Sequence, residues 1–343
     1  MHFHTVIIGA GPGGLACARM LADHGIQTLV LERKENIGAK VCAGGITWGG
    51  LISQVPRDLA EKSFPVQHII TRLQKVRIEE PTPIIATVNR VKLGNHMARQ
   101  ALNAGAEIMT GRQVKEINGQ TLIIEEKESR KRQEISFDYL VGADGSNSLV
   151  RRHLGLTSNK MGIGINYQIS GDLSRMEWHL NSRFFRNGYG WIFPHGKTVS
   201  IGAYVPRSVM PAQQLKKGLI AWAETRGFSL AREQARADYI NYDYQGWRFG
   251  RIFLIGDAAG LASGLTGEGI YPAIISGEEA ARTIIDPDYS STVMKGLVRK
   301  QRLHSRMTDW TGYSPVFNII AGEFVTLGLR CGLIKFSKLE MAV

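Results

Sequence analysis

Short apolar runs and amphipathic segments alternate at the start of the chain. A β-branched run at residues 4–8 leads through a glycine-rich loop into an apolar-periodic segment, residues 15–24, which ends at Gly25. A second apolar run follows at residues 27–31. This order predicts a strand, a helix and a second strand, because helices commonly end at a glycine in the left-handed conformation. The chain therefore opens with a βαβ unit.

The rest of the chain continues with both kinds of pattern. Helical periodicity covers 92–103, 213–226, 268–285 and most of 298–336, and strand patterns cover 116–137, 139–142, 161–169, 198–204 and 252–255. The dipeptide Asn118-Gly119 predicts a tight hairpin turn. No internal repeat or low-complexity linker interrupts these elements. We therefore expect two interleaved domains rather than two separate ones.

The loop after the first strand fits the GxGxxG pattern of dinucleotide-binding proteins. In such a unit Gly9 permits the tight turn, Gly11 lets the backbone approach a pyrophosphate, and Gly14 lets the helix pack closely. The helix amino terminus adds positive potential. Glu32 ends the second strand, where a carboxylate accepts hydrogen bonds from ribose hydroxyls. We expect the next residue, Arg33, to contact the bound cofactor as well. The complete loop reads Gly9-Ala10-Gly11-Pro12-Gly13-Gly14, and by itself it does not distinguish FAD from NAD.

Charge and cysteine content narrow the function classes. Lys and Arg total 42 against 30 Asp and Glu, a net charge of +12 that favours anionic partners such as phosphate-bearing cofactors or acidic lipids. The basic residues form no aromatic-interleaved motif, so we do not expect nucleic-acid binding. Three cysteines suit a reducing compartment, and no run approaches the ~20 apolar residues of a membrane span. We expect a cytoplasmic protein, either free or peripheral to a membrane.

Two distant segments indicate which dinucleotide is bound. Residues 141–148 resemble the DG motif of the p-hydroxybenzoate hydroxylase superfamily, and residues 251–260 resemble its GD motif. The resemblance implies non-covalent FAD, with Asp257 holding ribityl or ribose hydroxyls, and Arg90 stands where the family has an arginine near the phosphates. The residues implied to contact FAD in the two motifs are Asp144, Gly145, Gly256 and Asp257.

The same resemblance implies an α/β fold. A Rossmann-like FAD-binding domain of the p-hydroxybenzoate hydroxylase type would be interleaved with a smaller α+β substrate domain that contains an antiparallel sheet. The expected FAD-binding domain comprises residues 1–75, 84–160 and 245–290, the substrate domain comprises 76–83 and 161–244, and a C-terminal helical region comprises 291–343.

Three further segments resemble geranylgeranyl reductases, a branch of this superfamily. They are residues 40–45 (Lys-Val-Cys-Ala-Gly-Gly), 188–194 (Gly-Tyr-Gly-Trp-Ile-Phe-Pro) and 265–271 (Leu-Thr-Gly-Glu-Gly-Ile-Tyr). The resemblance implies additional FAD contacts from Lys40, Cys42, Ala43, Gly267, Glu268, Gly269 and Ile270. Cys42, Tyr189 and Trp191 would form a substrate channel or help deliver a proton, although a core role suits each of them too. The chain departs from the family pattern at Ser263-Gly264 and at an inserted Ala43.

The expected activity is reduction of carbon–carbon double bonds in an isoprenoid lipid or diphosphate, by hydride transfer from reduced FAD. There is no second GxGxxG unit, so NADPH would visit transiently or reduced ferredoxin would donate electrons. Two alternatives stay open: an FAD-dependent monooxygenase or halogenase acting on an apolar or aromatic substrate, and a non-catalytic flavin-bearing electron-transfer protein. We expect no metal site.

The tail contains an apolar stretch, residues 316–336, that is interrupted by Glu323, Arg330 and Lys335. These charges make it too polar for a membrane span yet apolar enough for an amphipathic helix. The helix would either pack over the substrate domain or form the mouth of a channel at a membrane surface.

Overall fold

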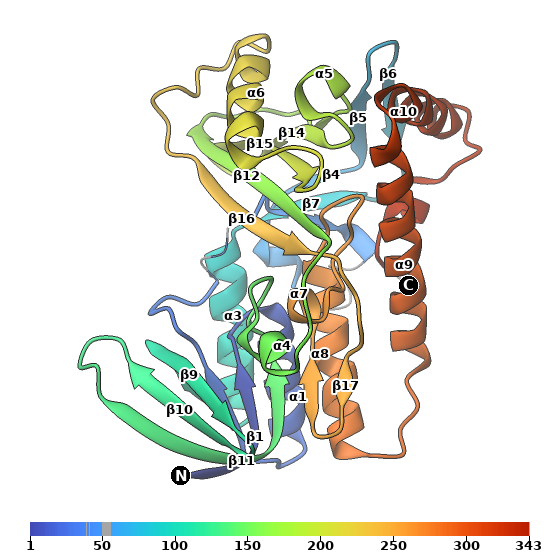
Figure 1. Cartoon of the computed structure of the whole chain (residues 1–343). Coiled ribbons are helices and arrows are strands. Elements are labelled where there is room, and N and C mark those ends of the chain that lie inside the picture. The colour runs from blue at the N-terminus through green and yellow to red at the C-terminus, as the bar shows by residue number, and fades with distance from the viewer. Residues whose placement is uncertain (39, 41, 50–55, 343) are drawn as a thin grey trace.

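The computed structural model describes residues 1–38, 40, 42–49 and 56–342. In this part of the chain, eight strands form the sheet in the lower half of Figure 1. Parallel strands β8, β2, β1, β11 and β18 form its main path, and β9, β10 and β17 add antiparallel pairs. The strands are β1 (His2–Ile8), β2 (Thr28–Leu31), β8 (Glu107–Met109), β9 (Arg112–Asn118), β10 (Thr121–Glu126), β11 (Arg132–Gly142), β17 (Arg248–Phe249) and β18 (Ile252–Leu254).

The central strands are apolar without alternation because both of their faces are covered. Ile7 packs with residues of helices α1 (Pro12–Asp23), α3 (Arg90–Asn103) and α8 (Ile270–Ile285). Its neighbour Val6 packs on the opposite face. That face also carries the short helices α4 (Leu149–His153) and α7 (Gly256–Ala259). A sheet buried on two sides is typical of a doubly wound α/β fold.

Helices α1 and α8 touch at their glycines. A Cβ atom at Gly277 would lie 2.2 Å from the Gly13 carbonyl oxygen, and one at Gly13 would lie 2.6 Å from the Ala273 carbonyl oxygen. Only glycine permits backbones to approach this closely. The contact fixes the amino end of α1 beside α8, at the carboxyl edge of the parallel strands.

A second sheet lies in the upper half of Figure 1 and contains seven strands of the described residues, in the order β16-β12-β15-β14-β13-β5-β6. One face packs on α5 (Ser182–Phe185) and α6 (Ala212–Glu224). The other face presents Trp191, Phe193 and Tyr204 toward the first domain. The strands are β5 (Val66–Ile70), β6 (Lys75–Glu79), β12 (Met161–Ser170), β13 (Glu177–His179), β14 (Tyr189–Pro194), β15 (Thr198–Pro206) and β16 (Arg236–Asn241).

The expected boundary between residues 75 and 76 falls at the start of β6. Strand β5 pairs with β6 on one side and, in parallel, with β13 on the other. We therefore propose that the substrate domain takes residues 66–79 as well as 161–241. Between the two large sheets lies a three-stranded one, which contains β3 (Gly45–Thr47), β7 (Ile85–Val88) and β4 (Ala60–Phe64), the last preceded by the 3-10 turn η1 (Arg57–Leu59).

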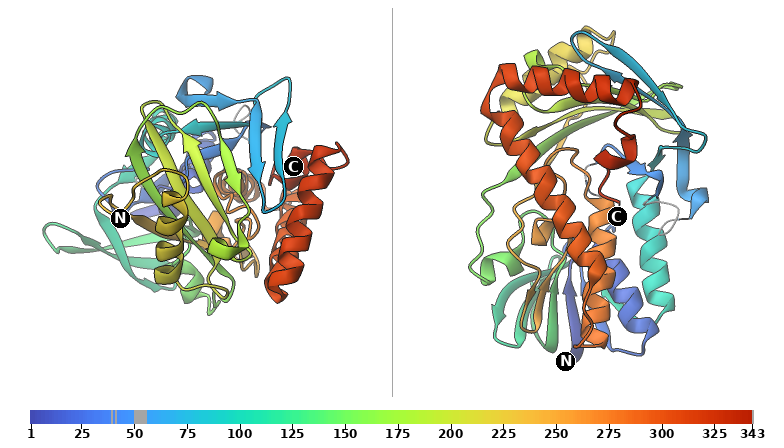
Figure 2. Two further views of the ribbon diagram at one scale, coloured as in Figure 1. Left: turned by 90° about the horizontal axis from the view of Figure 1, so that it is seen from above. Right: turned by 90° about the vertical axis from the view of Figure 1, so that its right-hand side faces the viewer.

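The C-terminal region is helical, as predicted. Helix α9 (Thr292–Tyr313) runs along the side of the molecule, and α10 (Pro315–Arg330) crosses the upper domain against β6 and α5, as the right-hand view of Figure 2 shows. Residues 336–342, beginning with the turn η2 (Phe336–Leu339), return toward the first domain. None of the described helices combines the length and hydropathy needed to cross a bilayer.

Two local predictions from the sequence pattern agree with the structure. The opening βαβ unit is β1, α1 and β2, and the hairpin turn at Asn118-Gly119 joins β9 to β10. The expected α/β fold with an antiparallel-sheet domain is confirmed.

Candidate functional site

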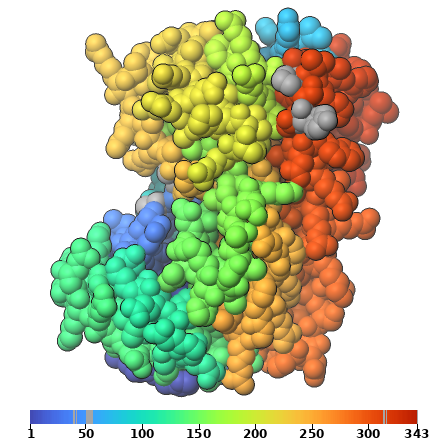
Figure 3. All heavy atoms as spheres, viewed as in Figure 1, coloured from blue at the N-terminus to red at the C-terminus, as the bar shows by residue number. Residues whose placement is uncertain are grey.

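A cavity of about 450 Å³ lies between the two large sheets. The space-filling view in Figure 3 shows the upper and lower halves meeting at a waist, with the C-terminal helices along one side. The cavity wall includes the first glycine loop, the cysteine loop, the loop before α8, the aromatic face of the upper sheet and the inner face of α10. Segments that the sequence predicted to act together are therefore gathered around one space.

The first glycine loop leaves open backbone at the amino end of α1. Gly9 has a φ of +109°, and a Cβ there would lie 2.4 Å from the Ala143 carbonyl oxygen. At Gly11 the nearest atom to such a Cβ, the same oxygen, is 3.9 Å away. Helix α1 has Pro12 in its first turn and no side-chain cap. Its free N–H groups can therefore bind an anion.

Arg90 supplies a cation to the same wall. Its Nε and Nη1 atoms are buried without a hydrogen-bond partner among the described residues. Buried guanidinium nitrogens normally find acceptors. Together with the open backbone at Gly11, these nitrogens fit the pyrophosphate of a dinucleotide.

Glu32 is ordered by the backbone around it. The Ala10 N–H donates to its Oε2 atom at 2.9 Å, and the Lys34 N–H donates to its Oε1 atom at 3.0 Å. The carboxylate is therefore held at the end of β2 beside the glycine loop, as the sequence predicted. Arg33 is exposed and is not among the residues that line the cavity.

Asp257, at the start of α7, is joined to the cysteine loop and to the DG motif. Its Oδ2 atom accepts hydrogen bonds from Lys40 Nζ at 2.7 Å and from the Ser146 hydroxyl at 3.0 Å. Burial by itself would lower the pKa of Lys40, but the Asp257 and Asp238 carboxylates outweigh it, so that pKa is raised. Lys40 is thus a persistent cation on the wall.

Asp144, the aspartate of the DG motif, caps a helix and does not line the cavity. Its Oδ2 atom accepts from the Leu149 N–H at 2.6 Å and so caps α4, while its Oδ1 atom is buried without a partner in the described chain. Burial raises its pKa. Its neighbour Gly145 lines the cavity, but Asp144 does not. Gly256, with a φ of +54°, lines the cavity beside Asp257.

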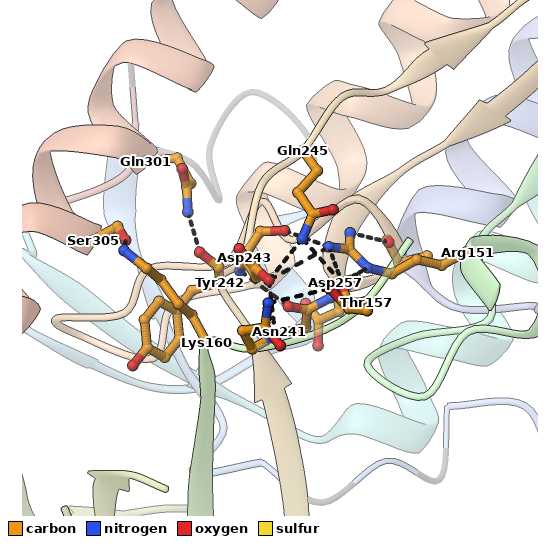
Figure 4. A network of polar contacts seen from close by, with 12 residues as sticks. Arg151, Thr157, Lys160, Asn241, Tyr242, Asp243, Gln245, Asp257, Gln301 and Ser305 are labelled. Carbon is orange, nitrogen blue, oxygen red and sulfur yellow. Dashed lines mark hydrogen bonds and ion pairs between the residues drawn. The ribbon is translucent and has the colours of Figure 1, made fainter. Parts of the chain in front are cut away.

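Behind Asp257 lies a polar network that the sequence did not reveal (Figure 4). Arg151, buried on α4 just after the DG motif, donates to the main-chain oxygens of Thr157, Asp243 and Ala258. Asn241 Nδ2 donates to the Asp257 carbonyl oxygen at 2.9 Å.

Helix α9 joins the same network. Its Gln301 Nε2 donates to the Tyr242 carbonyl oxygen, and its Ser305 hydroxyl accepts from Lys160 Nζ. A further bond joins Gln245 to Asp243. These contacts fix α7 relative to the upper sheet and α9.

Hydrogen bonds of the Ser263 side chain order the loop before α8. The Ser263 hydroxyl accepts from the Leu265 and Thr266 N–H groups, so its proton is directed at His304 Nδ1, 2.8 Å away on α9. Gly267 has a φ of +68°, where glycine is favoured. Gly269 ends the loop without a side-chain cap. The first N–H groups of α8 therefore face the cavity, with Ile270 at the first helical position.

The cysteine loop is pinned to the upper domain. Asn166 Nδ2 donates to the Cys42 carbonyl oxygen at 3.3 Å, and His195 Nε2 lies 3.0 Å from the Ala43 carbonyl oxygen. The Gly44 N–H donates to Cys42 Sγ at 3.3 Å. Val41 lies outside the described residues. Asn166 and His195 carry no motif, so the sequence gave no signal for these anchors.

The predicted aromatic residues do line the cavity. The Tyr189 hydroxyl donates to the Thr266 carbonyl oxygen at 2.5 Å, and burial raises the pKa of Tyr189. Trp191 Nε1 donates to the Ser200 hydroxyl, which donates in turn to Asn166 Oδ1. Trp178 and Phe193 complete the wall, with ring centroids 4.7 Å apart. Trp191 is both a core residue and a cavity residue.

Comparison with known proteins identifies the cofactor. Residues 2–183, more than half of the chain, match the family described as FAD binding domain. The chain belongs to this family. It is a flavoprotein whose cofactor is FAD, as the sequence predicted. Among the described residues, no group of His, Cys, Asp and Glu could hold a metal ion.

Individual relatives refine the comparison. An uncharacterized protein of Methanosarcina barkeri is 30% identical, over 89% of this chain and 79% of its own. A geranylgeranyl diphosphate reductase of Rhodobacter capsulatus is 28% identical, over 82% of this chain and 74% of its own. The crystal structure of a geranylgeranyl bacteriochlorophyll reductase-like protein from Thermoplasma acidophilum aligns with a TM-score of 0.83 at 22% identity, covering 98% and 94% of the two chains. The predicted relationship to geranylgeranyl reductases is confirmed.

Proposed function

We propose that this flavoprotein reduces carbon–carbon double bonds in an isoprenoid, either a geranylgeranyl-type lipid or a diphosphate. The observation that carries the proposal is the single cavity, which joins the FAD loops to an aromatic wall and then to the inner face of α10. Its size lies in the range of small-molecule sites, roughly 300–1,000 Å³. The relationship to geranylgeranyl reductases supports the same substrate class.

We assign the cofactor to the residues that face the cavity or order its loops. Bound, reduced FAD supplies a hydride to the substrate. The anionic pyrophosphate would lie against the amino end of α1 and Arg90, and Asp257 would accept from sugar hydroxyls. We propose direct contacts from Gly9, Gly11, Pro12, Gly13, Gly14, Glu32, Lys40, Cys42, Ala43, Arg90, Gly145, Gly256, Asp257, Gly267, Glu268, Gly269 and Ile270. Asp144 would act by capping α4. The contact expected from Arg33, whose side chain is exposed, stays a prediction.

The amino end of α8 tunes the cofactor. If a reduced flavin presented its pyrimidine edge here, the free N–H groups and the dipole of α8 would stabilise the negative charge on it. Gly267 and Gly269 keep side chains out of this approach. The chain thus favours the reduced form at the position where the substrate must meet it.

Tyr189 and Trp191 form the walls of the substrate channel in this proposal. Flat aromatic surfaces suit an extended prenyl chain. Both side chains already have hydrogen-bond partners, so they present mainly their rings to the cavity. Cys42, which the Gly44 N–H orients, would shape the site next to Tyr189 or assist proton delivery.

The electron donor would be NADPH or reduced ferredoxin. The basic net charge of +12 favours either partner, since both are anionic. Anaerobic mixing of the oxidised protein with each donor distinguishes them through the loss of flavin absorbance. The donor that bleaches the flavin, with or without substrate present, is assigned as the electron donor.

We also propose that α10 rests on a membrane surface. Its outer face carries a row of exposed apolar side chains, while its inner face lines the cavity. Such a face adsorbs to the headgroup region, and a basic protein is attracted to anionic lipids. The exposed residues on α10 are Val316, Phe317, Ile320, Phe324 and Leu327.

Co-sedimentation with anionic vesicles at low salt tests this contact. Phe324→Asp should abolish binding, because Phe324 is 68% exposed on that face. Leu102→Asp, at a position on α3 that is 50% exposed, is the matched control and should bind normally. Equal binding by the two variants, or none by the wild-type protein, would rule out the role of α10.

A mass-spectrometric screen tests the activity. The dithionite-reduced protein is incubated anaerobically with prenyl alcohols, diphosphates and glycerophospholipids, and products with added hydrogen atoms are sought. We expect saturation of at least one prenyl compound. Oxygen consumption that yields an oxygenated or halogenated product, with no prenyl reduction, would instead support the monooxygenase or halogenase alternative.

A further inference from the structure

Two carboxyl groups line the cavity at or near the loop before α8. Glu268 belongs to that loop, and Glu340 follows η2. Both residues line the cavity, and Glu340 is 8% exposed. The reduction of a double bond consumes a proton as well as a hydride, so a buried acid at this position has a chemical use.

Both carboxylate oxygens of Glu268 accept hydrogen bonds. The Thr47 hydroxyl donates to its Oε1 atom at 3.2 Å, and the Met341 N–H donates to its Oε2 atom at 2.9 Å. Burial raises the pKa of Glu268, and both donors oppose that rise. Because both oxygens already accept hydrogen bonds, the ionised form is the better fit to its surroundings.

Glu340 lacks such donors. Within the part of the chain that the structure describes, its carboxyl group has no hydrogen-bond partner, and Lys300 Nζ donates instead to the main-chain oxygens of Glu340 and Ala342. Burial, followed by the charge of Glu268, raises the pKa of Glu340 to about 7, against the opposing effect of Lys300. When two carboxyl groups lie close together, a shared proton is favoured on the one that accepts fewer hydrogen bonds, and by that criterion the favoured site is Glu340.

The other ionisable groups around the pair come from three elements. Lys300 on α9 lies near both acids, Lys338 on η2 lies near Lys300, and Tyr189 on β14 lies near Glu268 and Cys42. Burial raises the pKa of Tyr189 and lowers that of Lys300. The Lys300 ammonium donates to main-chain oxygens of Glu340 and Ala342, and the Tyr189 hydroxyl donates to the Thr266 carbonyl oxygen, so the protons of these groups already have acceptors.

We propose that Glu340 donates the proton in double-bond reduction and that Glu268 is the positioning residue that keeps it protonated. The inference rests on the proposed function. In the step, the carbon–carbon π bond breaks, one carbon receives the hydride that reduced flavin supplies, and the other receives the Glu340 proton. Glu340 is left as a carboxylate, which solvent reprotonates. Proton donation of this kind contributes about 10²- to 10⁴-fold to a rate.

Infrared titration of the holoprotein tests the protonation of Glu340 without turnover. We expect a protonated-carboxyl band in the wild-type protein that disappears as the pH rises through about 7. The band should be missing from Glu340→Gln and unchanged in Ser337→Ala, a matched control at an exposed position on η2. A band that persists in Glu340→Gln, or its absence from the wild-type protein, overturns the assignment.

Single-turnover oxidation of the reduced enzyme by geranylgeranyl diphosphate tests the role in the reaction. Glu340→Gln should slow it by about 10²- to 10⁴-fold, and Glu340→Asp should restore part of the rate. The wild-type rate should fall as Glu340 ionises, and Glu268→Gln should move that fall to lower pH. Unchanged rates and pH profiles in these variants refute the role. A wild-type protein that reduces no prenyl compound contradicts the proposed function instead, and the infrared result still decides whether Glu340 is protonated.

Discussion

Replacement of His195 by alanine should loosen the cysteine loop. The side chain is 7% exposed and joins two segments: Nδ1 lies 2.6 Å from Glu61 Oε2, and Nε2 lies 3.0 Å from the Ala43 carbonyl oxygen. Alanine removes both contacts. Among the described residues, the loop that carries Cys42 then keeps the bond from Asn166, the backbone bond from Val88 to Gly44, the Lys40–Asp257 ion pair and the pairing of Gly45 with β7.

The structure gives the size of the effect. A hydrogen bond to a charged group contributes about 1.5–3 kcal/mol and a neutral one about 1 kcal/mol. Glu61 is 21% exposed, so water can replace part of its lost interaction. We therefore expect His195→Ala to lower the free energy of unfolding by about 2–3 kcal/mol. His153→Ala, an exposed histidine without a hydrogen bond among the described residues, is the matched control.

Two assays on the holoprotein measure this change. Urea denaturation gives the loss of stability, and a thiol reagent reports the accessibility of Cys42. The second assay needs a Cys331→Ser background because Cys331 is exposed, whereas Cys17 is buried. Cys42 should react faster in His195→Ala. If the stability and the thiol rate both match the His153→Ala control, the described anchoring of the loop is incorrect.

Three other changes test neighbouring parts of the structure. Gly267→Val should leave the fold intact but impair FAD binding or reduction, because φ is +68° and the new Cβ would meet Tyr189 and Ile240 at 3.5 and 3.4 Å; wild-type flavin affinity and reduction rate would disprove this. Gly322→Leu should shorten the prenyl chain that the enzyme accepts, since Gly322 lines the cavity with room for a Cβ; an unchanged chain-length preference argues against a channel along α10. Burial lowers the pKa of His304 from 6.5 to about 4. Its neutral form therefore contributes full stability above pH 6.5, and about 3 kcal/mol is lost as the pH falls toward 4. His304→Asn should flatten this pH dependence in urea titrations, and an unchanged slope would contradict it.

Local patterns were sufficient for the opening βαβ unit and the hairpin. Each depends on residues close together in the chain: the apolar runs of β1 and β2, the glycines around α1, and the Asn118-Gly119 turn. The motifs at Gly9, Asp144 and Asp257 also mark segments that meet at one cavity, which Gly11, Gly145 and Asp257 line. Asp144 nonetheless caps α4, because the DG segment leads directly into that short helix.

Long-range pairing accounts for what the sequence did not predict. Strand β5 pairs with β13 about a hundred residues later, so the domain boundary near residue 75 had no local signal. The anchors His195 and Asn166 meet the cysteine loop only in the folded chain, just as the Met341 N–H, next to Glu340, meets Glu268. Helix α10 ends at Arg330, before the predicted end at residue 336, because the chain turns at Gly332, which has a φ of +71°.

Anaerobic single turnover with a prenyl substrate tests the central claim most directly. The FAD-loaded protein is reduced with one equivalent of dithionite and mixed with geranylgeranyl diphosphate, while flavin absorbance and product mass are followed together. The account predicts that one flavin is reoxidised for each double bond that gains two hydrogen atoms. A flavin that stays reduced in the presence of every prenyl compound, yet is reoxidised productively by oxygen together with an aromatic substrate, would contradict it.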